Sequence, residues 1–417
     1  MHRQRGLGYA SALVGGSIII GPYLKPAWLM ALVIILFSLI LWRFFDTKYL
    51  SYTFCILAAL YGIGLLPFFV VATTLAMLAL GELVFQRGAD DLNTYLYYII
   101  STAWAGVLVM TYLSYVISTA PAGMIIMTSL PESALLSIIF GIIAAVLLKV
   151  ILLKYEDSLM IEGVGIAMTM WLIQELNYQA NLQMVVAAVI VGFTFGYFAF
   201  RSKTADLSGL FSAALVGIIL LVFADPKWFL IMFAFFILGS AATKYKYEYK
   251  KRIGVEQGQS GARGYKNVFA NGIAACAAAV LFGVFQQPVF IVMYVGCVAT
   301  AAADTLASEI GVTGGVPFMI TTLKRVPIGT NGGVTLVGES VALIGGFVVS
   351  LTALLLGVIN LPMLVICTIA GFVGTNIDSL IGATLENRGF LGNAGTNLLA
   401  TISGGLFAVA VYLLMGF

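Results

Sequence analysis

The feature that most constrains the fold is a series of apolar runs, each about 20 residues long, that recurs along the whole chain. A helix of that length rises about 30 Å, which is the thickness of the hydrocarbon core of a bilayer. The mean hydropathy of +1.05 and the charged fraction of only 9% agree with such runs being membrane spans. A membrane barrel needs alternation with period two, which the runs lack. The sequence therefore predicts an all-α, polytopic membrane protein.

We expect about fifteen spans, because a crossing helix needs about 20 apolar residues. With the N-terminus in the cytoplasm, nearly all Lys and Arg residues fall on the cytoplasmic side, as the positive-inside rule requires. The basic start MHRQRG is interpreted as the beginning of an uncleaved first helix, because further spans follow it. The expected spans are 7–22, 27–45, 50–64, 66–86, 96–117, 130–149, 158–178, 183–200, 207–224, 227–243, 268–285, 288–303, 336–357, 361–383 and 395–415.

One stretch, residues 305–323, fits neither a span nor a loop. It is too apolar for an ordinary loop, and Gly311, Gly314, Gly315 and Pro317 interrupt any helix there. We expect a re-entrant or interfacial segment, which is tolerated at membrane depth where it is buried in protein or lines a wet cavity.

Polar residues concentrate in the second half of the chain, which divides it into two parts. Residues 1–195 carry little chemistry and are expected to form N-terminal transmembrane helices of unknown role. Acidic residues near the ends of their spans, Glu82 among them, are expected to be solvated, whereas Glu162 lies deeper. Residues 196–417 hold the polar motifs ADTLASEIG at 303–311, TLKRVPIGTNGG at 322–333 and GTNIDSLIGATLENRG at 374–389. Ionisable residues within spans are costly, so we take this second part as the location of the functional site.

Asp304 and Ser308 are four residues apart and share a helix face, whereas Glu309 points elsewhere. A carboxylate at this depth that faces a phosphate pocket is suited to Mg²⁺, which takes a few carboxylates and leaves its other positions to water and phosphates. The alternative is a structural salt bridge from Asp304 to Lys324 or Arg325.

A basic stretch runs from Thr243 to Lys266. Its Arg263 and Lys266, with Asn267 and Asn271, fall about one helical turn apart where the chain re-enters the membrane, and a helix start favours anions. The alternative is an ordinary cytoplasmic loop that is attracted to anionic lipid headgroups.

The triplet Gly-Thr-Asn occurs three times, beginning at Gly329, Gly374 and Gly395, and always at a predicted cytoplasmic end of a span. Glycine permits close backbone approach with exposed amides, and Thr and Asn supply neutral donors. Three triplets at one membrane face indicate binding of phosphate or of a polar headgroup. Walker-type, GxGxxG and HExxH motifs are absent from the sequence.

These motifs, together with SAATKYKYEYKKR and RGYKNVFANG, resemble the multi-pass family that contains the plant chloroplast phytyl-phosphate kinase. The series is more distantly similar to dolichol kinases, phytol kinases and phosphatidate cytidylyltransferases. The resemblance covers residues 200–417 and implies a CTP-transferase-like or prenyl-phosphate kinase-like catalytic domain over residues 196–417. It further implies Mg²⁺, and CTP or ATP as co-substrate. The cytidylyltransferases have several aspartates near HGG and DR, whereas GTNIDSL keeps only Asp378, which favours phosphorylation over cytidylyl transfer.

The residues and the resemblance together predict a lipid kinase that converts a prenyl monophosphate, phytyl or geranylgeranyl phosphate, into the diphosphate. Little more than positioning and charge neutralisation is needed, because a phosphate monoester is already ionised near neutral pH. The candidate catalytic residues are Asp304, Lys324, Arg325 and Asp378, with Asp304 and Asp378 as metal ligands. The candidate nucleotide- and phosphate-binding residues are Lys244, Arg263, Lys266, Asn267, Asn271, Ser308, Thr330, Asn331, Asn376, Ser379, Arg388 and Asn397.

Three alternatives stay open: a CDP-lipid-forming cytidylyltransferase, a prenyl-alcohol kinase and a small-molecule transporter. A transporter predicts polar groups near the bilayer midplane and an internal repeat, whereas these motifs gather at one face. The partners we expect are the lipid bilayer, a prenyl phosphate and a nucleoside triphosphate, with no nucleic acid and with a homodimer left open. The expected location is the plasma membrane, with the active site facing the cytoplasm.

Overall fold

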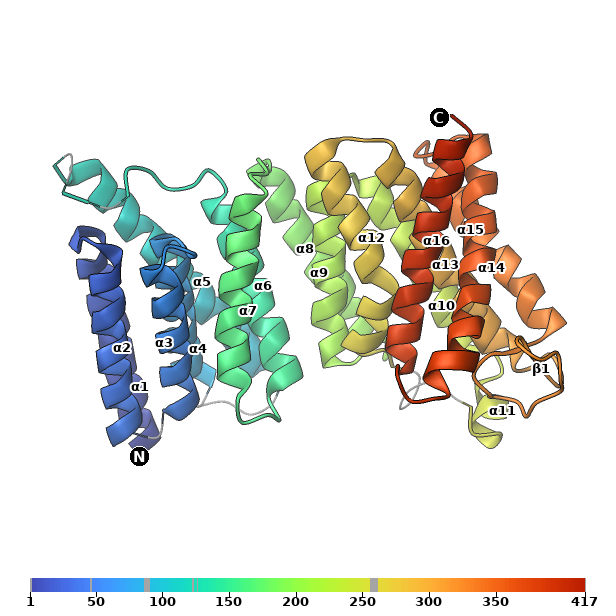
Figure 1. The fold of residues 1–417 in the computed structure, drawn as a ribbon, viewed down its shortest axis with the longest axis horizontal. Coiled ribbons are helices and arrows are strands. Elements are labelled where there is room, and N and C mark those ends of the chain that lie inside the picture. Colours follow the sequence, from blue (N-terminus) through green and yellow to red (C-terminus); the bar gives the residue numbers. More distant parts are fainter. Residues whose placement is uncertain are drawn as a thin grey trace. The chain divides into compact units, whose positions relative to one another are not determined.

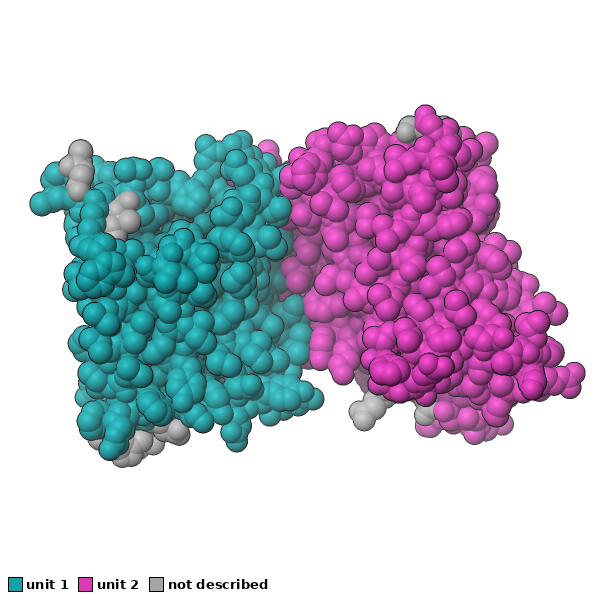
Figure 2. Space-filling view, viewed as in Figure 1, with its two compact units in different colours: residues 1–180 teal, residues 181–417 magenta. Residues whose placement is uncertain are grey.

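The computed structural model describes residues 2–45, 47–85, 91–121, 124–125, 127–255 and 262–416, with the side chains of residues 2–5 left out. Helices make up 78% of the chain and strand is almost absent from the described part, so the predicted class of polytopic helical membrane protein is confirmed. The chain divides into two compact units, residues 1–180 and residues 181–417 (Figure 2). This division falls just before α8 (Leu182–Arg201), whereas the sequence-based boundary at residue 195 falls inside that helix.

Each apolar segment expected to span the membrane corresponds to a helix. Eleven of the described helices are long and apolar enough to cross a bilayer. The count of fifteen spans stays a prediction, because two of the remaining helices, α3 and α9, have only 15 and 17 residues.

Unit 1 is built from seven longer helices. They are α1 (His2–Ile20), α2 (Ala27–Phe44), α3 (Lys48–Gly62), α4 (Phe68–Phe85), α5 (Leu92–Thr119), α6 (Ala134–Leu152) and α7 (Ser158–Glu175), with a short 3₁₀ turn η1 (Gly21–Tyr23) after α1. Of the residues of α4, 78% are buried, and the helix packs against α1, α5 and α7. α4 is therefore the core helix of the unit.

Four polar side chains meet inside unit 1. Lys149 of α6 forms ion pairs with Glu82 of α4 and with Glu162 of α7, the second at 2.8 Å between Nζ and Oε2. The Tyr98 hydroxyl of α5 donates to the Glu162 carboxylate. The exposed fractions are 3% for Lys149, 4% for Glu82 and 0% for both Glu162 and Tyr98. The expectation that Glu82 is solvated is therefore wrong, because the end of α4 lies beneath α6 and α7 rather than in a loop.

The described part of unit 2 contains α8 and eight further helices, together with a two-stranded hairpin and one π-helical turn. They are α9 (Leu207–Phe223), α10 (Pro226–Lys244), α11 (Tyr247–Arg252), α12 (Tyr265–Phe285), α13 (Val289–Gly311), β1 (Phe318–Met319), β2 (Gly333–Val334), α14 (Leu336–Leu355), α15 (Leu361–Ile381), the π-helical turn η3 (Gly382–Glu386) and α16 (Asn393–Leu414).

α13 is the central helix of unit 2, with α10, α12, α14, α15 and α16 packed around it. Small residues let the backbones approach closely, as the alanine-rich sequence predicts. A Cβ on Gly345 of α14 would lie 3.0 Å from the Ala302 carbonyl oxygen, and one on Gly371 of α15 would lie 3.0 Å from that of Ala299. Such contacts fix the depth at which Asp304 sits.

The polar motifs of unit 2 gather at one end of its helices. Figure 1 shows α11, the β1–β2 hairpin, the turn before α16 and the end of α15 together at this end, with the C-terminus at the other. Residues 305–311 continue α13 rather than forming a re-entrant loop, and α13 ends at Gly311. The chain then forms the hairpin, in which Phe318 pairs with Val334 and Met319 with Gly333.

Candidate functional site

A cavity of about 320 Å³ opens at the polar end of unit 2. Its walls are the last turns of α13, the start of α14, the end of α15 with η3, and the glycine-rich stretch of the hairpin. We call it the acidic cavity. Its polar side chains belong to Asp304, Ser308, Thr330, Asn331, Thr335, Glu339, Thr375, Asp378, Ser379, Glu386 and Asn393.

Two aspartates from neighbouring helices face each other in this cavity. Asp304 of α13 is 9% exposed, and both Asp304 and Asp378 of α15 line the cavity wall. Two ionised carboxylates can only accept, and within the described ranges Oδ1 of Asp378 is buried without a donor. A buried polar atom without a partner is costly, so this oxygen is suited to an external ligand.

A hard divalent cation fits this set of oxygens. Mg²⁺ takes one or two carboxylates and completes its shell with water and substrate phosphates. Within the described part of the chain, no group of three or more His, Cys, Asp or Glu residues forms a ready-made metal site. A cation at Asp304 and Asp378 therefore depends on ligands that a phosphate or water supplies.

The three Gly-Thr-Asn triplets meet at the acidic cavity in different ways. Thr330 and Asn331 line it directly, as does Thr375. Asn376 donates to Oε2 of Glu339 at 3.0 Å, and Thr396 donates to Oε2 of Glu386 at 3.0 Å. The second and third triplets thus each bind a glutamate of the cavity wall.

Glycine is required where the hairpin meets α15. Gly332 has φ of +80°, and a Cβ there would lie 2.7 Å from the Ser379 carbonyl oxygen and 2.5 Å from Cβ of Ala383. Only a glycine adopts this backbone without strain and allows the approach. The loop that carries Thr330 and Asn331 is thereby held against the end of α15 and against its continuation η3. Single π-helical turns such as η3 are frequent at functional sites, and this one carries Glu386 into the wall.

The predicted basic residues of the hairpin lie outside the cavity wall. Lys324 and Arg325 are exposed between β1 and β2, and the Arg325 guanidinium stacks over the Phe318 ring at 5.9 Å. Neither forms an ion pair with Asp304 within the described residues, so the structure does not contain the salt bridge that was the alternative role of this aspartate. Arg388 is exposed in the turn after η3.

The predicted residues of the basic stretch form a second location. Lys244 and Arg263 line a separate cavity of about 190 Å³, together with Lys203. Burial lowers the pKa of the Arg263 guanidinium, and the charge of Glu309 acts in the opposite direction. Residues 256–261 of this stretch lie outside the described residues.

The remaining predicted residues are spread along two helices. Lys266 is exposed at the start of α12, and Asn267 lines an apolar pocket between helices. Asn271 is buried and donates to the Asn267 carbonyl oxygen at 2.9 Å. Asn397 is half-buried on α16, outside the lining of the acidic cavity.

Three charged residues of these cavities escaped the sequence-based prediction: Glu339, Glu386 and Lys203. Glu386 belongs to the motif GTNIDSLIGATLENRG, and Glu339 follows shortly after the motif TLKRVPIGTNGG. The signal was therefore present in their neighbours along the chain. Lys203 carries no signal beyond its charge, since its place follows from the left-handed turn, with φ of +58°, that ends α8.

Residues 189–405 match the family described as Integral membrane protein DUF92. An uncharacterised membrane protein of Methanocaldococcus jannaschii is 35% identical over 215 residues, which is 51% of this chain and 87% of the relative. An uncharacterised membrane protein of Synechocystis is 33% identical over 48% of this chain and 79% of its own. The chloroplastic protein VTE6 of Arabidopsis thaliana is 31% identical over 48% of this chain and 63% of its own. No solved structure matches.

Proposed function

The chain belongs to the DUF92 family of integral membrane proteins, and from this premise we propose that unit 2 is a membrane phosphotransferase. It transfers a phosphoryl group from a nucleoside triphosphate to a prenyl monophosphate and yields the diphosphate. The observation that carries the proposal is the acidic cavity, where Asp304 and Asp378 meet a glycine-rich loop and Oδ1 of Asp378 has no donor in the described structure.

The relatives support the class of reaction. The C-terminal motifs resemble the family of the plant phytyl-phosphate kinase, and the 31% identity to VTE6 supports a prenyl-phosphate kinase-type activity. The match to the family model, residues 189–405, contains the whole acidic cavity. The donor, CTP or ATP, and the prenyl chain are parts of the proposal that the experiment below decides.

The cavity supplies what phosphoryl transfer requires. The backbone amides of Gly329, Asn331 and Gly332, with the hydroxyl group of Ser379, bind the phosphates of the nucleotide. Asp304 and Asp378 would hold Mg²⁺, which would neutralise charge on those phosphates. Glu339 and Glu386, which accept hydrogen bonds from Asn376 and Thr396, add negative charge to the cavity and so strengthen its attraction for a divalent cation.

The reaction needs no protein base. An ionised oxygen of the acceptor's phosphate forms the new bond to the terminal phosphorus of the nucleotide, and the bond to the nucleoside diphosphate breaks with its electron pair leaving on that product. The absence of histidine beyond His2 is consistent with this chemistry. The exposed cations Lys324, Arg325 and Arg388 at the polar end of unit 2 attract the nucleotide.

The orientation of the site is also part of the proposal. Lys and Arg residues gather at the end of unit 2 that holds the acidic cavity, and basic loops face the cytoplasm. We place the protein in the plasma membrane with this end in the cytoplasm, where nucleoside triphosphates are available. A cysteine substituted for Lys324 is then labelled by an impermeant maleimide only in inverted vesicles; labelling in right-side-out vesicles contradicts the orientation.

The activity is tested on protein purified into nanodiscs, with Mg²⁺, geranylgeranyl or phytyl monophosphate, and labelled CTP or ATP. A labelled prenyl diphosphate is expected, and Asp378→Asn and Asp304→Asn each should lower its rate at least about 100-fold. Glu248→Gln is the matched control, because this exposed carboxylate of α11 lies outside the cavity. Formation of a CDP-lipid would move the reaction to cytidylyl transfer, and consumption of neither nucleotide would refute the proposal.

A further inference from the structure

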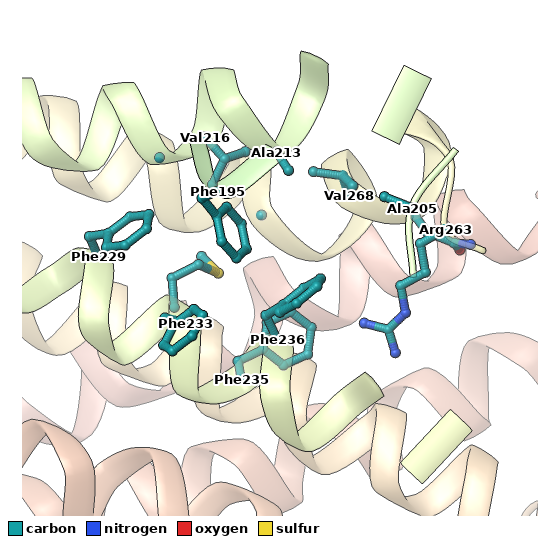
Figure 3. Close-up of a pocket in the computed structure, with 14 residues that line it drawn as sticks. Phe195, Ala205, Ala213, Val216, Phe229, Phe233, Phe235, Phe236, Arg263 and Val268 are labelled. Carbon is teal, nitrogen blue, oxygen red and sulfur yellow. The ribbon is translucent and has the colours of Figure 1, made fainter. Parts of the chain in front are cut away.

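A narrow aromatic pocket lies between α8, α9, α10 and α12 of unit 2. It holds about 60 Å³ and is walled by phenylalanines of α8 and α10. Figure 3 shows the rings of Phe195, Phe229, Phe233 and Phe236 on one side of the pocket and the Arg263 side chain at its other end. The Arg263 guanidinium lies 6.0 Å from the centre of the Phe235 ring.

A second pocket, of about 190 Å³, continues from the same arginine. Three cations line it, Lys203, Lys244 and Arg263, and none of the described residues in its lining is a carboxylate. Its other lining residues bear hydroxyl groups: Thr204, Ser240, Thr243 and Tyr247. Arg263 therefore lies on the boundary between an apolar pocket and a basic one, which we call the basic pocket.

Among the described residues, the guanidinium of Arg263 has no ion-pair partner. Its Nη2 donates to the Thr243 hydroxyl at 3.3 Å, and in the described parts of the chain no carboxylate lies within 4.0 Å of it. The nearby carboxylate of Glu309 is already occupied, since it pairs with Lys250 and accepts from Thr243 at 3.0 Å. A half-buried guanidinium without a counter-ion is costly, so the basic pocket is complementary to an anion.

Two further details favour an oxyanion with several acceptor atoms. The Ser240 hydroxyl is buried and has no hydrogen-bond partner among the described residues. Gly239 makes room for the arginine, because a Cβ there would lie 2.8 Å from Nη2 and 2.9 Å from Nη1 of Arg263. The planar guanidinium, the free hydroxyl and two lysines together match a phosphate, which accepts hydrogen bonds on three oxygens.

We propose that the basic and aromatic pockets together bind a single-chain lipid monophosphate, with its phosphate against Arg263 and Lys244 and the first part of its chain among the phenylalanines. The small volume and aromatic walls of the apolar pocket admit one hydrocarbon chain rather than the paired chains of a phospholipid. The role of this lipid as the acceptor rests on the proposed function, whereas its binding stands apart from turnover.

The test is direct binding to the full-length protein in phosphatidylcholine nanodiscs, measured by microscale thermophoresis or native mass spectrometry without nucleotide. Geranylgeranyl monophosphate is the main probe. Three further probes separate the contributions to binding. Inorganic phosphate tests the oxyanion alone, geranylgeraniol tests the chain alone, and phosphatidate tests a phosphate with two chains. Arg263→Gln and Lys244→Gln alter the basic pocket, and Lys251→Gln is the matched control, because this exposed lysine of α11 lines neither pocket.

Arg263→Gln is expected to weaken geranylgeranyl monophosphate roughly 10- to 100-fold, and Lys244→Gln about tenfold or less. Lys251→Gln should leave binding unchanged. Geranylgeraniol should bind more weakly and not respond to Arg263→Gln, while inorganic phosphate should bind weakly and respond. Should Arg263→Gln not fold, Arg263→Lys replaces it; it keeps the charge but loses the paired donors, and an affinity reduced about three- to tenfold supports the site.

Equal binding of geranylgeranyl monophosphate to the wild type and to the Arg263 variant overturns the proposal. Equal Arg263-dependent affinity for phosphatidate overturns its single-chain part. Arg263-dependent binding with no nucleotide consumed leaves the site standing and refutes the kinase. If the protein forms prenyl diphosphate while the Arg263→Gln variant binds geranylgeranyl monophosphate normally, the kinase stands and the proposed binding site is refuted.

Discussion

Replacement of Lys149 by methionine is expected to lower the free energy of unfolding by about 3–5 kcal/mol. The lysine is buried between Glu82 and Glu162, and its removal leaves two buried carboxylates without a counter-charge. Methionine keeps the volume and the flexibility of the chain, so the loss reports charge rather than packing. In a unit of 180 residues this corresponds to a fall in Tm of roughly 6–20 °C.

The carboxylates should respond differently. Glu82→Gln leaves Lys149 paired with Glu162 at 2.8 Å, so charge balances and the expected loss is about 1 kcal/mol or less. The triple variant Lys149→Met, Glu82→Gln, Glu162→Gln removes every charge of the cluster. It should recover most of the stability that Lys149→Met loses, because neutral groups bear a smaller desolvation penalty.

These variants are compared by circular dichroism in mixed micelles, as thermal unfolding and as unfolding by added SDS. A Lys149→Met protein that melts with the wild type, or a Glu82→Gln protein that is destabilised as much as Lys149→Met, would refute the reasoning. A triple variant less stable than Lys149→Met would show that hydrogen bonds rather than charge hold the cluster.

Three other predictions concern the acidic cavity. Gly332→Ala should lower phosphoryl transfer at least about tenfold with little change in Tm, because the added methyl displaces the loop from Ser379; equal activity in the radiolabel assay contradicts this. Thr335→Ala should lower the free energy of unfolding by about 1–2 kcal/mol, as measured by thermal unfolding. The Thr335 hydroxyl caps α14 by accepting from the Gly338 amide, and it donates to the Gly311 carbonyl oxygen. Thr335→Ser keeps the hydroxyl and should lower the free energy of unfolding less. Trypsin should cleave the chain after Lys324. Nucleotide with Mg²⁺ should slow this cleavage at least about threefold, because it orders the hairpin. An unchanged rate of cleavage would show that the nucleotide binds elsewhere.

Much of the fold could be predicted from the sequence because its signals are local. The length of each apolar run sets a helix, and every expected span corresponds to one. The spacing of Asp304 and Ser308 sets a common face, and both line the acidic cavity while Glu309 turns to Lys250. The regular alternation of spans also brought the triplets to one end.

The features that could not be predicted have a common physical cause, which is contact between distant segments. Glu82 and Lys149 are 67 residues apart, and nothing in either helix specifies that they meet. Lys324 and Arg325 lie near Asp304 in order along the chain, but the pairing of Phe318 with Val334 turns them outward. The predicted site was therefore one group of residues, whereas the structure divides it between an acidic cavity and a basic pocket.

The exposed cations at the polar end of unit 2 bear a charge opposite to that of the acidic cavity. Under the proposed function, a polyphosphate is attracted by Lys324, Arg325 and Arg388 and is repelled by the carboxylates of Asp304 and Asp378 inside the cavity. A nucleotide with a bound divalent cation is attracted both by the exposed cations and by the carboxylates, whereas a nucleotide without one is attracted by the cations and repelled by the carboxylates. Because exposed charges act only over about 10 Å at 0.1 M salt, rising ionic strength should slow capture of the nucleotide while leaving its release nearly unchanged.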